Sequence, residues 1–296
     1  MDSAMLAFLA APFVASLILT GIHAYLGVHV VERGVIFVDL SLAQIAALGA
    51  AIAILLPITG GDPHAPVVYW ISLGFTFIGA AVFSTIRGHR ARIPQEAIIG
   101  ICYAVASAAA ILAMSKATSE SEHLKDMLVG NILAVSWPEV GKTALLYGAV
   151  GAFHFIFRHQ FLLISMDPKR AEAEGISIKF WDFLFYASFG FVVTSSVSIA
   201  GVLLVFCYLI VPSVAAMLYA DTIGRRLAIG WTMGTIVSAL GVYLSLLIDL
   251  PTGATIVCTF GLVLIVMALI RPLIQRSPAA DVHHVDYADR AHRATH

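Results

Sequence analysis

The sequence predicts an all-α protein, a polytopic transmembrane bundle of about nine helices (eight to nine), with the N-terminus outside and the C-terminus inside. Of its 296 residues, 60% are hydrophobic and 12% are charged, and the mean hydropathy is +0.93. A water-soluble globule of this composition could not cover its surface with polar groups. Two further observations favour the same fold class. The apolar residues form long runs, and the basic residues lie between alternate runs.

Nine segments are long and apolar enough to cross the hydrocarbon core of a bilayer, which takes about 17 to 25 helical residues. The first lacks a basic start and a cleavage site, so we interpret it as a retained span and not as a signal peptide. The break between the sixth and seventh, around Ser195–Gly201, is nearly absent. The predicted spans are Met5–Val28, Leu40–Leu56, Val67–Ile86, Ala97–Ser115, Val140–Phe157, Phe180–Ser198, Gly201–Tyr219, Leu227–Ile248 and Ala254–Ile270.

Lysine and arginine set the predicted orientation, because basic residues beside a span are retained on the cytoplasmic side. The outer connections contain only Lys116 and Lys125, and Lys142 falls at the outer end of the fifth span. Nine is an odd number of spans, and an odd number places the two ends of the chain on opposite sides of the membrane. The other fourteen of the 17 basic residues are cytoplasmic in this arrangement: Arg33, Arg87, Arg90, Arg92, Arg158, Lys169, Arg170, Lys179, Arg225, Arg226, Arg271, Arg276, Arg290 and Arg293.

Two stretches depart from a simple pattern of spans and loops. Leu124–Val135, within the fourth connection, is apolar but too short to cross, so we expect a re-entrant or surface-lying helix there. The last residues are polar and rich in histidine. The sequence therefore divides into a transmembrane domain, residues 1–276, and a cytoplasmic polar tail, residues 277–296, which we expect to be disordered.

Histidine and acidic side chains gather in two places where they could bind a cation. For the tail, the alternative to a cation site is a solvated polar segment that binds nothing. On the outer side, the same residue types would attract cations or contact another protein. The tail histidines are His283, His284, His292 and His296, and the outer residues are Asp62, His64, Glu120, Glu122 and His123.

Ionisable residues inside a membrane are functional by default, because a charge there is costly. An ion-coupled carrier usually needs acidic groups near mid-membrane, and this sequence has none there. The absence of such acidic groups indicates that a separate protein supplies the energy for transport. The few ionisable residues at span ends are Asp39, Glu96, Asp182 and Asp249, and those within spans are His23 and His154.

The sequence gives no sign of catalysis. It contains neither HExxH nor GxSxG. Ser136–Thr143 (SWPEVGKT) ends like a phosphate-binding loop, but it lacks the leading glycine and a preceding strand and lies on the predicted outer face. We therefore expect no enzymatic activity, no permanently bound cofactor and, with a net charge of −1, no nucleic-acid partner.

Four stretches carry a family resemblance: Arg33–Gly49 (RGVIFVDLSLAQIAALG), Glu96–Ile101 (EAIIGI), Leu128–Glu139 (LVGNILAVSWPE), and Gly201–Ala216 (GVLLVFCYLIVPSVAA) followed by Asp249–Gly253 (DLPTG). Together they resemble the metal-ion permease family of ABC transporters, the membrane subunits of zinc, manganese and iron uptake systems. The similarity runs from about Leu6 to Leu269.

The resemblance implies a metal path in the second and fourth spans. The family pattern has an acid and, four residues later, a histidine, which one helical turn places on the same face. Asp39 matches the acid, Ala43 stands at the histidine position, and Gln44 is the nearest polar neighbour. In the fourth span, Glu96 begins the helix and Tyr103 stands near a second family histidine. Imidazole favours zinc, whereas carboxylate and amide groups suit manganese or ferrous iron.

The resemblance also implies partners: cytoplasmic ABC ATPase subunits, an external metal-binding protein and a second permease, in a homodimer or heterodimer. The segment Pro212–Arg226 matches the element that couples related permeases to the ATPase. We expect Pro212 to interrupt the helix and Asp221, Arg225 and Arg226 to make polar contacts.

The expected function is therefore the permease subunit of an ATP-driven importer that moves a divalent metal ion across the bacterial inner (plasma) membrane. A secondary, ion-coupled transporter and an ABC permease for a metal chelate are the alternatives.

Overall fold

The computed structural model describes residues 3–59, 62, 65–86, 93–115 and 132–274. Every regular element in these ranges is helical, as the sequence predicts, and they contain no strand. Two single-turn 3₁₀ helices are η1 (Pro57–Thr59) and η2 (Ile132–Ala134). The α-helices are α1 (Ser3–Arg33), α2 (Val38–Leu55), α3 (Pro66–Ile86), α4 (Gln95–Met114), α6 (Trp137–Ile156), α7 (Arg158–Met166), α8 (Pro168–Ala173), α9 (Ile178–Met217), α10 (Ile223–Ile248) and α11 (Thr252–Ile274).

Among the described residues, seven helices are long and apolar enough to cross a membrane, or up to eight if α6 and α7, which meet at a 75° bend, form one broken span. The predicted first to fifth, eighth and ninth spans each correspond to one helix. The predicted sixth and seventh spans are joined in α9, a run of 40 residues. Their predicted boundary is still marked, because Gly201 has φ 75° and ψ 160°, which is not helical.

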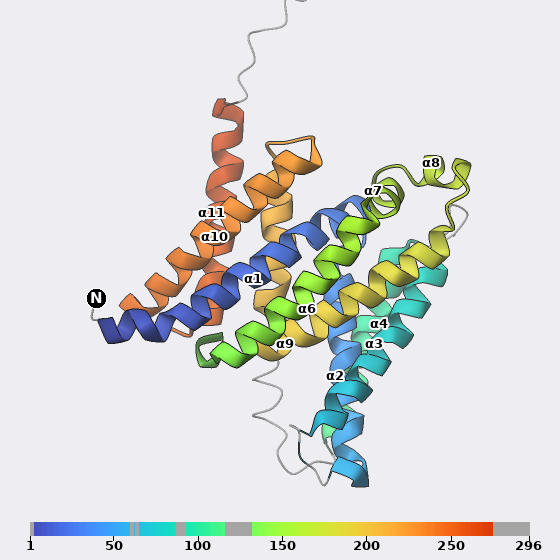
Figure 1. Ribbon diagram of the computed structural model, residues 1–296, viewed down its shortest axis with the longest axis horizontal. Helices are drawn as coiled ribbons and strands as arrows, with labels where there is room; N and C mark the ends of the chain where they lie inside the picture. Colours follow the sequence, from blue (N-terminus) through green and yellow to red (C-terminus); the bar gives the residue numbers. More distant parts are fainter. Residues whose placement is uncertain (1–2, 60–61, 63–64, 87–92, 116–131, 275–296) are drawn as a thin grey trace, which may run out of the picture.

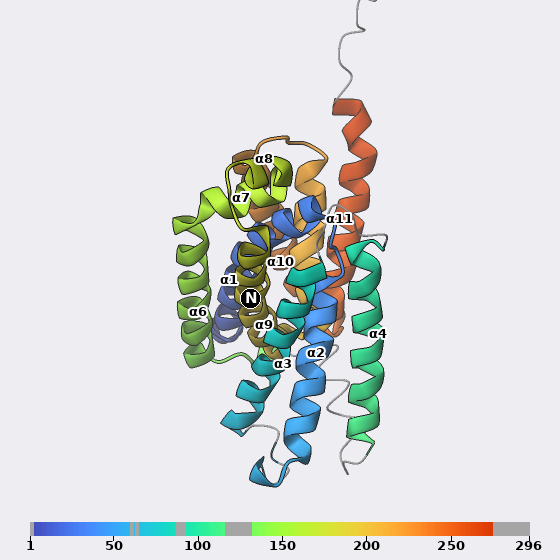
Figure 2. The ribbon, with the colours of Figure 1, turned by 90° about the vertical axis from the view of Figure 1, so that its right-hand side faces the viewer.

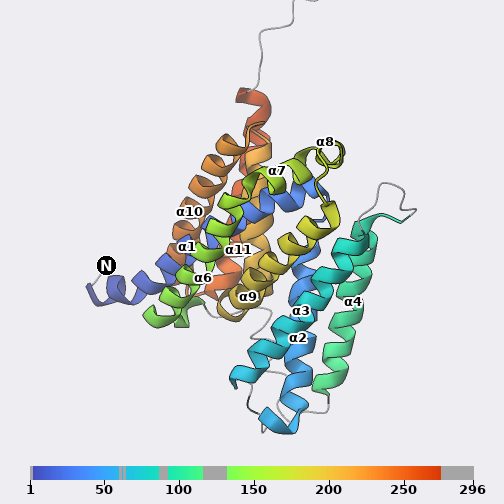
Figure 3. The same ribbon diagram turned by 45° about the vertical axis from the view of Figure 1, so that its right-hand side comes forward.

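The break in α9 redirects the chain. A positive φ disfavours any residue with a side chain, so glycine suits this position. Figures 1 and 3 show that the two halves of α9, coloured yellow and light orange, leave the bend in different directions. The second half therefore returns through the bundle.

α9 is the central helix of the bundle. It packs against α2 and α3 on one side and against α1, α10 and α11 on the other, and α4 packs against α2 (Figures 2 and 3). Large side chains of α9 are completely buried, among them Phe185, Phe189 and Tyr208. The core is thus built around this helix.

Small residues allow α1 to lie close to α9 and α10. A Cβ atom on Gly27 would lie 1.9 Å from the carbonyl oxygen of Leu209 and 2.3 Å from the hydroxyl oxygen of Ser213. A Cβ atom on Gly234 would lie 2.4 Å from Cγ2 of Thr20. These two glycines set the distance between the helices, as small residues commonly do in membrane bundles.

The outward faces of the bundle are apolar. Leu112 on α4 is 70% exposed, Leu145 on α6 is 77% exposed and Leu269 on α11 is 69% exposed. A soluble monomer rarely leaves so much contiguous apolar surface in water. These faces therefore fit contact with lipid, as the composition predicts.

We expect Gly27→Ala to lower the free energy of unfolding by about 1–3 kcal/mol, the usual cost of overpacking, because the new methyl group must displace the backbone of α9. Gly21→Ala is the matched control on the same helix, since nothing lies within 4 Å of its Cβ position. Thermal unfolding of the detergent-solubilised protein measures both. Equal melting temperatures would contradict the close approach of α1 to α9.

Candidate functional site

Asp39 lies in the first turn of α2, just after the connection from α1. Gly34, with φ 68°, turns the chain at the end of α1, and Val35 and Val38 anchor the connection because both are completely buried. The Asp39 side chain is itself buried, with 2% exposed. Its Oδ1 oxygen has no hydrogen-bond partner among the described residues. A buried carboxylate oxygen without a partner is costly, so this position suits a visiting cation.

Glu96 lies in the first turn of α4 and reaches the start of α2, the helix whose first turn carries Asp39. Its Oε1 oxygen accepts the backbone N–H of Phe37 at 3.0 Å. Phe37 is the residue before α2, so this bond satisfies one of the donors that every helix start leaves open. Oε2 of Glu96 is buried and has no hydrogen-bond partner in the described part of the chain. Two carboxylates thus lie near the start of α2, where α4 approaches it, and each has an oxygen without a hydrogen-bond partner among the described residues.

The other residues predicted for the metal path are arranged less closely. Ala43, one turn beyond Asp39, is 2% exposed, and Gln44 is half-buried on α2. Tyr103 lies two turns beyond Glu96 and is 39% exposed. Within the described ranges, no group of three or more His, Cys, Asp or Glu side chains could hold a metal ion. The structure therefore brings together Asp39 and Glu96 and adds no third ligand of these types.

A second buried polar cluster, which sequence reasoning missed, lies where α1, α7 and α9 meet. Arg33 Nη1 pairs with Asp182 Oδ1 at 2.5 Å, and both side chains are completely buried. Arg33 Nε donates to Ser165 Oγ at 2.8 Å, and His29 Nδ1 lies 2.8 Å from the same oxygen. The guanidinium of Arg33 lies 3.9 Å from the centroid of the Phe185 ring, within the range of a cation–π contact.

The sequence contained one signal for this cluster, an arginine and an aspartate at the inner ends of two predicted spans. It gave no reason to pair them, because 149 positions separate Arg33 from Asp182. The two histidines predicted within spans are also buried and bonded. His154 Nε2 lies 2.8 Å from Ser188 Oγ, and His23 Nδ1 lies 2.8 Å from the Leu19 carbonyl oxygen.

The comparison with known families is decisive for the class of protein. The profile of the ABC 3 transport family matches residues 5–271, which is most of the chain. This chain belongs to the ABC 3 transport family. It is a multi-pass membrane protein of that family, as the resemblance in its sequence implies.

Relatives of this ABC 3 family chain include metal transport proteins. The manganese transport system membrane protein MntC of Listeria monocytogenes is 28% identical over 217 residues, 71% of this chain and 77% of MntC. The chelated iron transport system membrane protein YfeC of Yersinia pestis is 26% identical over 242 residues, 82% of this chain and 79% of YfeC. A chain of PsaBC from Streptococcus pneumoniae, solved in complex with Fab, has a TM-score of 0.73 at 24% identity, covering 88% of this chain and 90% of that one. The last likeness supports the fold alone.

The predicted coupling segment of this ABC 3 family chain begins within a helix. Pro212 is buried inside α9, which continues to Met217, so the prediction that Pro212 interrupts the helix is wrong. Transmembrane helices tolerate proline where neighbouring groups satisfy the freed backbone. Asp221 is exposed in the turn that leads into α10, and Arg225 is exposed in the first turn of α10.

Arg226 differs from its neighbour because it is turned towards α1. Its Nη1 pairs with Glu32 Oε1, and the two side chains are 12% and 22% exposed. Its Nε donates to the carbonyl oxygen of Ala220 at 2.9 Å. Of the two adjacent arginines, only Arg225 presents its charge openly to solvent.

α7 and α8 lie at the same end of the bundle as the turn between α9 and α10 (Figures 1 and 2). Asp167 caps α8 by accepting the backbone N–H of Arg170 at 3.0 Å. The Arg170 and His159 side chains donate hydrogen bonds to Glu174, which lowers the pKa of that carboxyl. These contacts give α8 a charged, exposed surface.

Asp62 is the one predicted outer residue that the structure describes. It is exposed, and its backbone N–H donates to the Thr59 carbonyl oxygen at 3.0 Å. Of the predicted re-entrant segment, Ile132–Ala134 forms η2, and the part before residue 132 lies outside the described residues. So do the remaining outer and tail candidates: His64, Glu120, Glu122, His123, His283, His284, His292 and His296.

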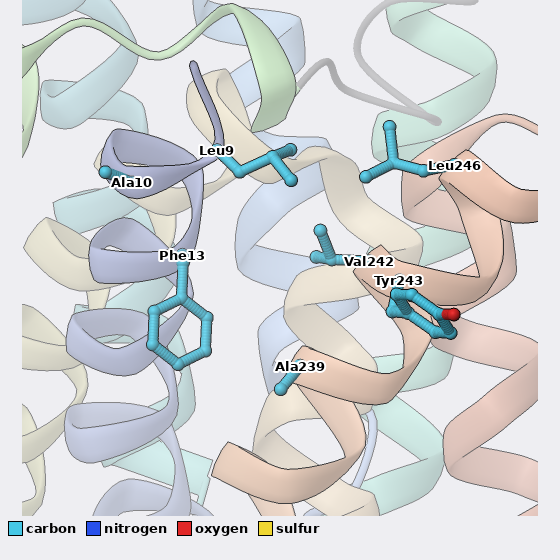
Figure 4. A pocket seen from close by; sticks show the side chains of 7 residues that line it. All are labelled: Leu9, Ala10, Phe13, Ala239, Val242, Tyr243 and Leu246. Carbon is cyan, nitrogen blue, oxygen red and sulfur yellow. The ribbon is translucent and has the colours of Figure 1, made fainter. Parts of the chain in front are cut away.

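An apolar cavity of about 220 Å³ lies between α1 and α10 (Figure 4). None of its lining side chains is charged or carries an imidazole, so it offers a metal ion no ligand of the usual kind. Its lining residues are Leu9, Ala10, Phe13, Ala239, Val242, Tyr243 and Leu246.

We expect Glu96→Ala to lower the free energy of unfolding by about 1 kcal/mol, because the Phe37 N–H loses its acceptor at the start of α2. Glu96→Gln keeps an oxygen at that position and should destabilise the protein less. Thermal unfolding of both variants beside the parent measures the difference. If alanine and glutamine have the same effect, the bond to Phe37 does not support α2.

Proposed function

We propose that this chain is the permease subunit of an ATP-driven ABC importer in the bacterial inner membrane, with a divalent transition-metal ion as its cargo. Family membership supports an ABC transporter over an ion-coupled carrier. The relatives MntC and YfeC, proteins of manganese and chelated iron transport systems, support a metal cargo. ATP hydrolysis belongs to separate cytoplasmic subunits, and this chain provides the path.

The observation that carries the proposal is the pair of carboxylates at the junction of α2 and α4. Asp39 is buried with an unpartnered oxygen, and Glu96 contributes another. Water, backbone oxygens or the second permease would complete the coordination of a passing ion. A transport path must bind the ion weakly enough to release it again. Two carboxylate ligands meet this requirement better than a site in which the protein provides every ligand.

The ligand types favour manganese or ferrous iron over zinc. Asp39 and Glu96 supply carboxylate oxygens and Gln44 on α2 can add an amide oxygen, whereas Ala43 stands where the family pattern has an imidazole. Oxygen ligands suit manganese, and imidazole suits zinc. Tyr103 is the proposed continuation of the path along α4. A metal chelate is the second candidate cargo, and the name of YfeC supports it.

We propose nine spans, with the N-terminus outside and the C-terminus in the cytoplasm. A straight helix of the 40 residues in α9 would be about 60 Å long, roughly twice the hydrocarbon thickness. Division at Gly201 gives two spans of ordinary length, and α6 with α7 provides one more. The end of the bundle that carries α7, α8 and the turn before α10 is then cytoplasmic, in agreement with its basic residues.

The proposed complex contains two cytoplasmic ATPase subunits, an external metal-binding protein and a second permease, identical or paralogous. The exposed Asp221 and Arg225 form the proposed ATPase contact, and Pro212 and Arg226 belong to the same proposed coupling segment. The proposed outer contact for the binding protein consists of Asp62, His64, Glu120, Glu122 and His123. The proposed metal-binding residues of the tail are His283, His284, His292 and His296.

Cellular metal content tests the function. Cells express this permease with its ATPase and binding protein, or with an ATPase inactivated in its nucleotide site, and elemental mass spectrometry measures manganese, iron and zinc. We expect ATPase-dependent accumulation of manganese or iron. Accumulation of zinc alone would contradict the proposed metal preference. If no metal accumulates when it is supplied as the free ion, the ionic cargo is wrong and a chelate takes its place.

We expect Asp39→Asn to reduce metal uptake on the order of tenfold, since a contact to a charged group contributes about 1.5–3 kcal/mol and 1.4 kcal/mol is a factor of ten. Assembly with the ATPase, measured by co-purification, should not change. Asp249→Asn is the control, because Asp249 is the left-handed cap of α10 with φ 55° and asparagine tolerates that conformation. Normal uptake by Asp39→Asn would remove this carboxylate from the path.

A further inference from the structure

The last turn of α1 carries two adjacent charges that reach in different directions. Glu32 pairs with Arg226 in the first turn of α10. Arg33 pairs with Asp182 in the first turns of α9. The end of α1 therefore lies between two connections, the α7–α8 segment and the turn from α9 to α10, which occupy the same end of the bundle (Figures 1 and 2).

The Arg33 contacts hold two helices at once. Besides the ion pair with Asp182 on α9, Arg33 Nε donates to Ser165 Oγ at 2.8 Å, and Ser165 belongs to the last turn of α7. Ser165 in turn donates to the Phe161 carbonyl oxygen at 2.8 Å. Removing one partner of a buried ion pair is strongly destabilising, so α1, α7 and the start of α9 are held together at this point.

The Glu32 contacts hold the other connection. Arg226 donates through Nε to the carbonyl oxygen of Ala220 at 2.9 Å, and Ala220 lies in the turn between α9 and α10. The same guanidinium pairs with Glu32 through Nη1. One arginine thus fixes the shape of the turn and attaches it to α1.

We propose that Glu32 and Arg33 form a junction that makes the α7–α8 segment and the α9–α10 turn move as one body when the ATPase acts on this end of the permease. Arg226 is then a positioning residue that acts through Glu32, and not a direct contact of the ATPase. The junction also reaches the metal path, because Gly34 and the start of α2 follow Arg33 directly and Asp39 lies six positions on. The transport part of this proposal rests on the proposed function.

A charge exchange tests the Glu32 contact in the complete complex, reconstituted in liposomes with the ATPase and the binding protein. Glu32→Arg and Arg226→Glu each place like charges together, and we expect metal delivered per ATP hydrolysed to fall about fivefold in each. The double variant, Glu32→Arg with Arg226→Glu, restores opposite charges and should return this ratio to within about twofold of the parent. Arg271→Glu, an exposed basic residue of the last turn of α11, is the control for charge reversal. Failure of the exchange to restore the ratio would overturn the proposal in favour of a direct ATPase contact.

A distance measurement tests the common movement without reference to the cargo. Spin labels are attached at Lys169→Cys on α8 and Ala228→Cys on α10, both exposed positions, after replacement of Cys102, Cys207 and Cys258. In the parent complex, the distance between the labels should be the same without nucleotide and with ATP. Glu32→Arg should broaden or shift it, and the charge exchange should restore it. A distance that changes with ATP in the parent would overturn the proposal, even if the metal cargo is confirmed.

The Arg33 contact is tested without breaking its ion pair. Ser165→Ala removes the hydroxyl that accepts from Arg33, and the label distance should broaden. Ser188→Ala is the matched control, because Ser188 is also buried and bonds to His154 Nε2 at 2.8 Å but does not touch the end of α1. If the two alanine variants give the same distances and the same ratio of metal to ATP, Ser165 is only a packing residue and the Arg33 half of the junction is wrong.

Discussion

Lipid offers no hydrogen-bond partner to a polar side chain, and this constraint determines how the helices of the bundle meet. A charged or imidazole side chain on a spanning helix therefore needs a partner within the protein, on its own helix or on another. Three such residues of α1 have partners across an interface: His29 and Arg33 reach Ser165 of α7, Arg33 also reaches Asp182 of α9, and Glu32 reaches Arg226 of α10. The position of α1 is therefore fixed by polar contacts as well as by close packing at Gly27.

The proposed metal path depends on this anchoring because it begins a few residues further along the chain. The chain turns at Gly34, Phe37 donates to Glu96, and Asp39 follows in the first turn of α2. A displacement of the end of α1 would shift this turn and the Glu96 bond together. The same short segment thus connects the end of the bundle proposed to contact the ATPase with the two carboxylates of the proposed metal path.

The chemistry of the site follows from what stands beside Asp39. A small, buried alanine occupies position 43, so no imidazole reaches the carboxylate from the next turn of α2. The remaining candidate ligands are oxygens, which fit the proposed manganese or ferrous iron cargo and a path that must release its ion. The apolar cavity between α1 and α10 has no such ligands, so the polar junction of α2 and α4 is the more suitable place for an ion.

The sequence by itself determined the class of fold and most of the helices. Composition and the length of the apolar runs are sufficient for this, because a bilayer of fixed thickness imposes a minimum length on each span. The sequence also marked Asp39 and Glu96, since acids at span ends stand out in an apolar chain. It also placed a break close to Gly201, where the non-helical glycine divides α9 into two halves that run in different directions.

Only the tertiary structure decided which of the polar residues meet. Arg33 and Asp182 stand far apart in the sequence, and no local pattern pairs them, because spacing along a chain reports contacts within a helix and not contacts between helices. The same limit applies to the two adjacent arginines, which look equivalent in sequence. In the structure Arg225 is exposed and Arg226 is turned towards Glu32, because the direction of each side chain depends on where α1 lies.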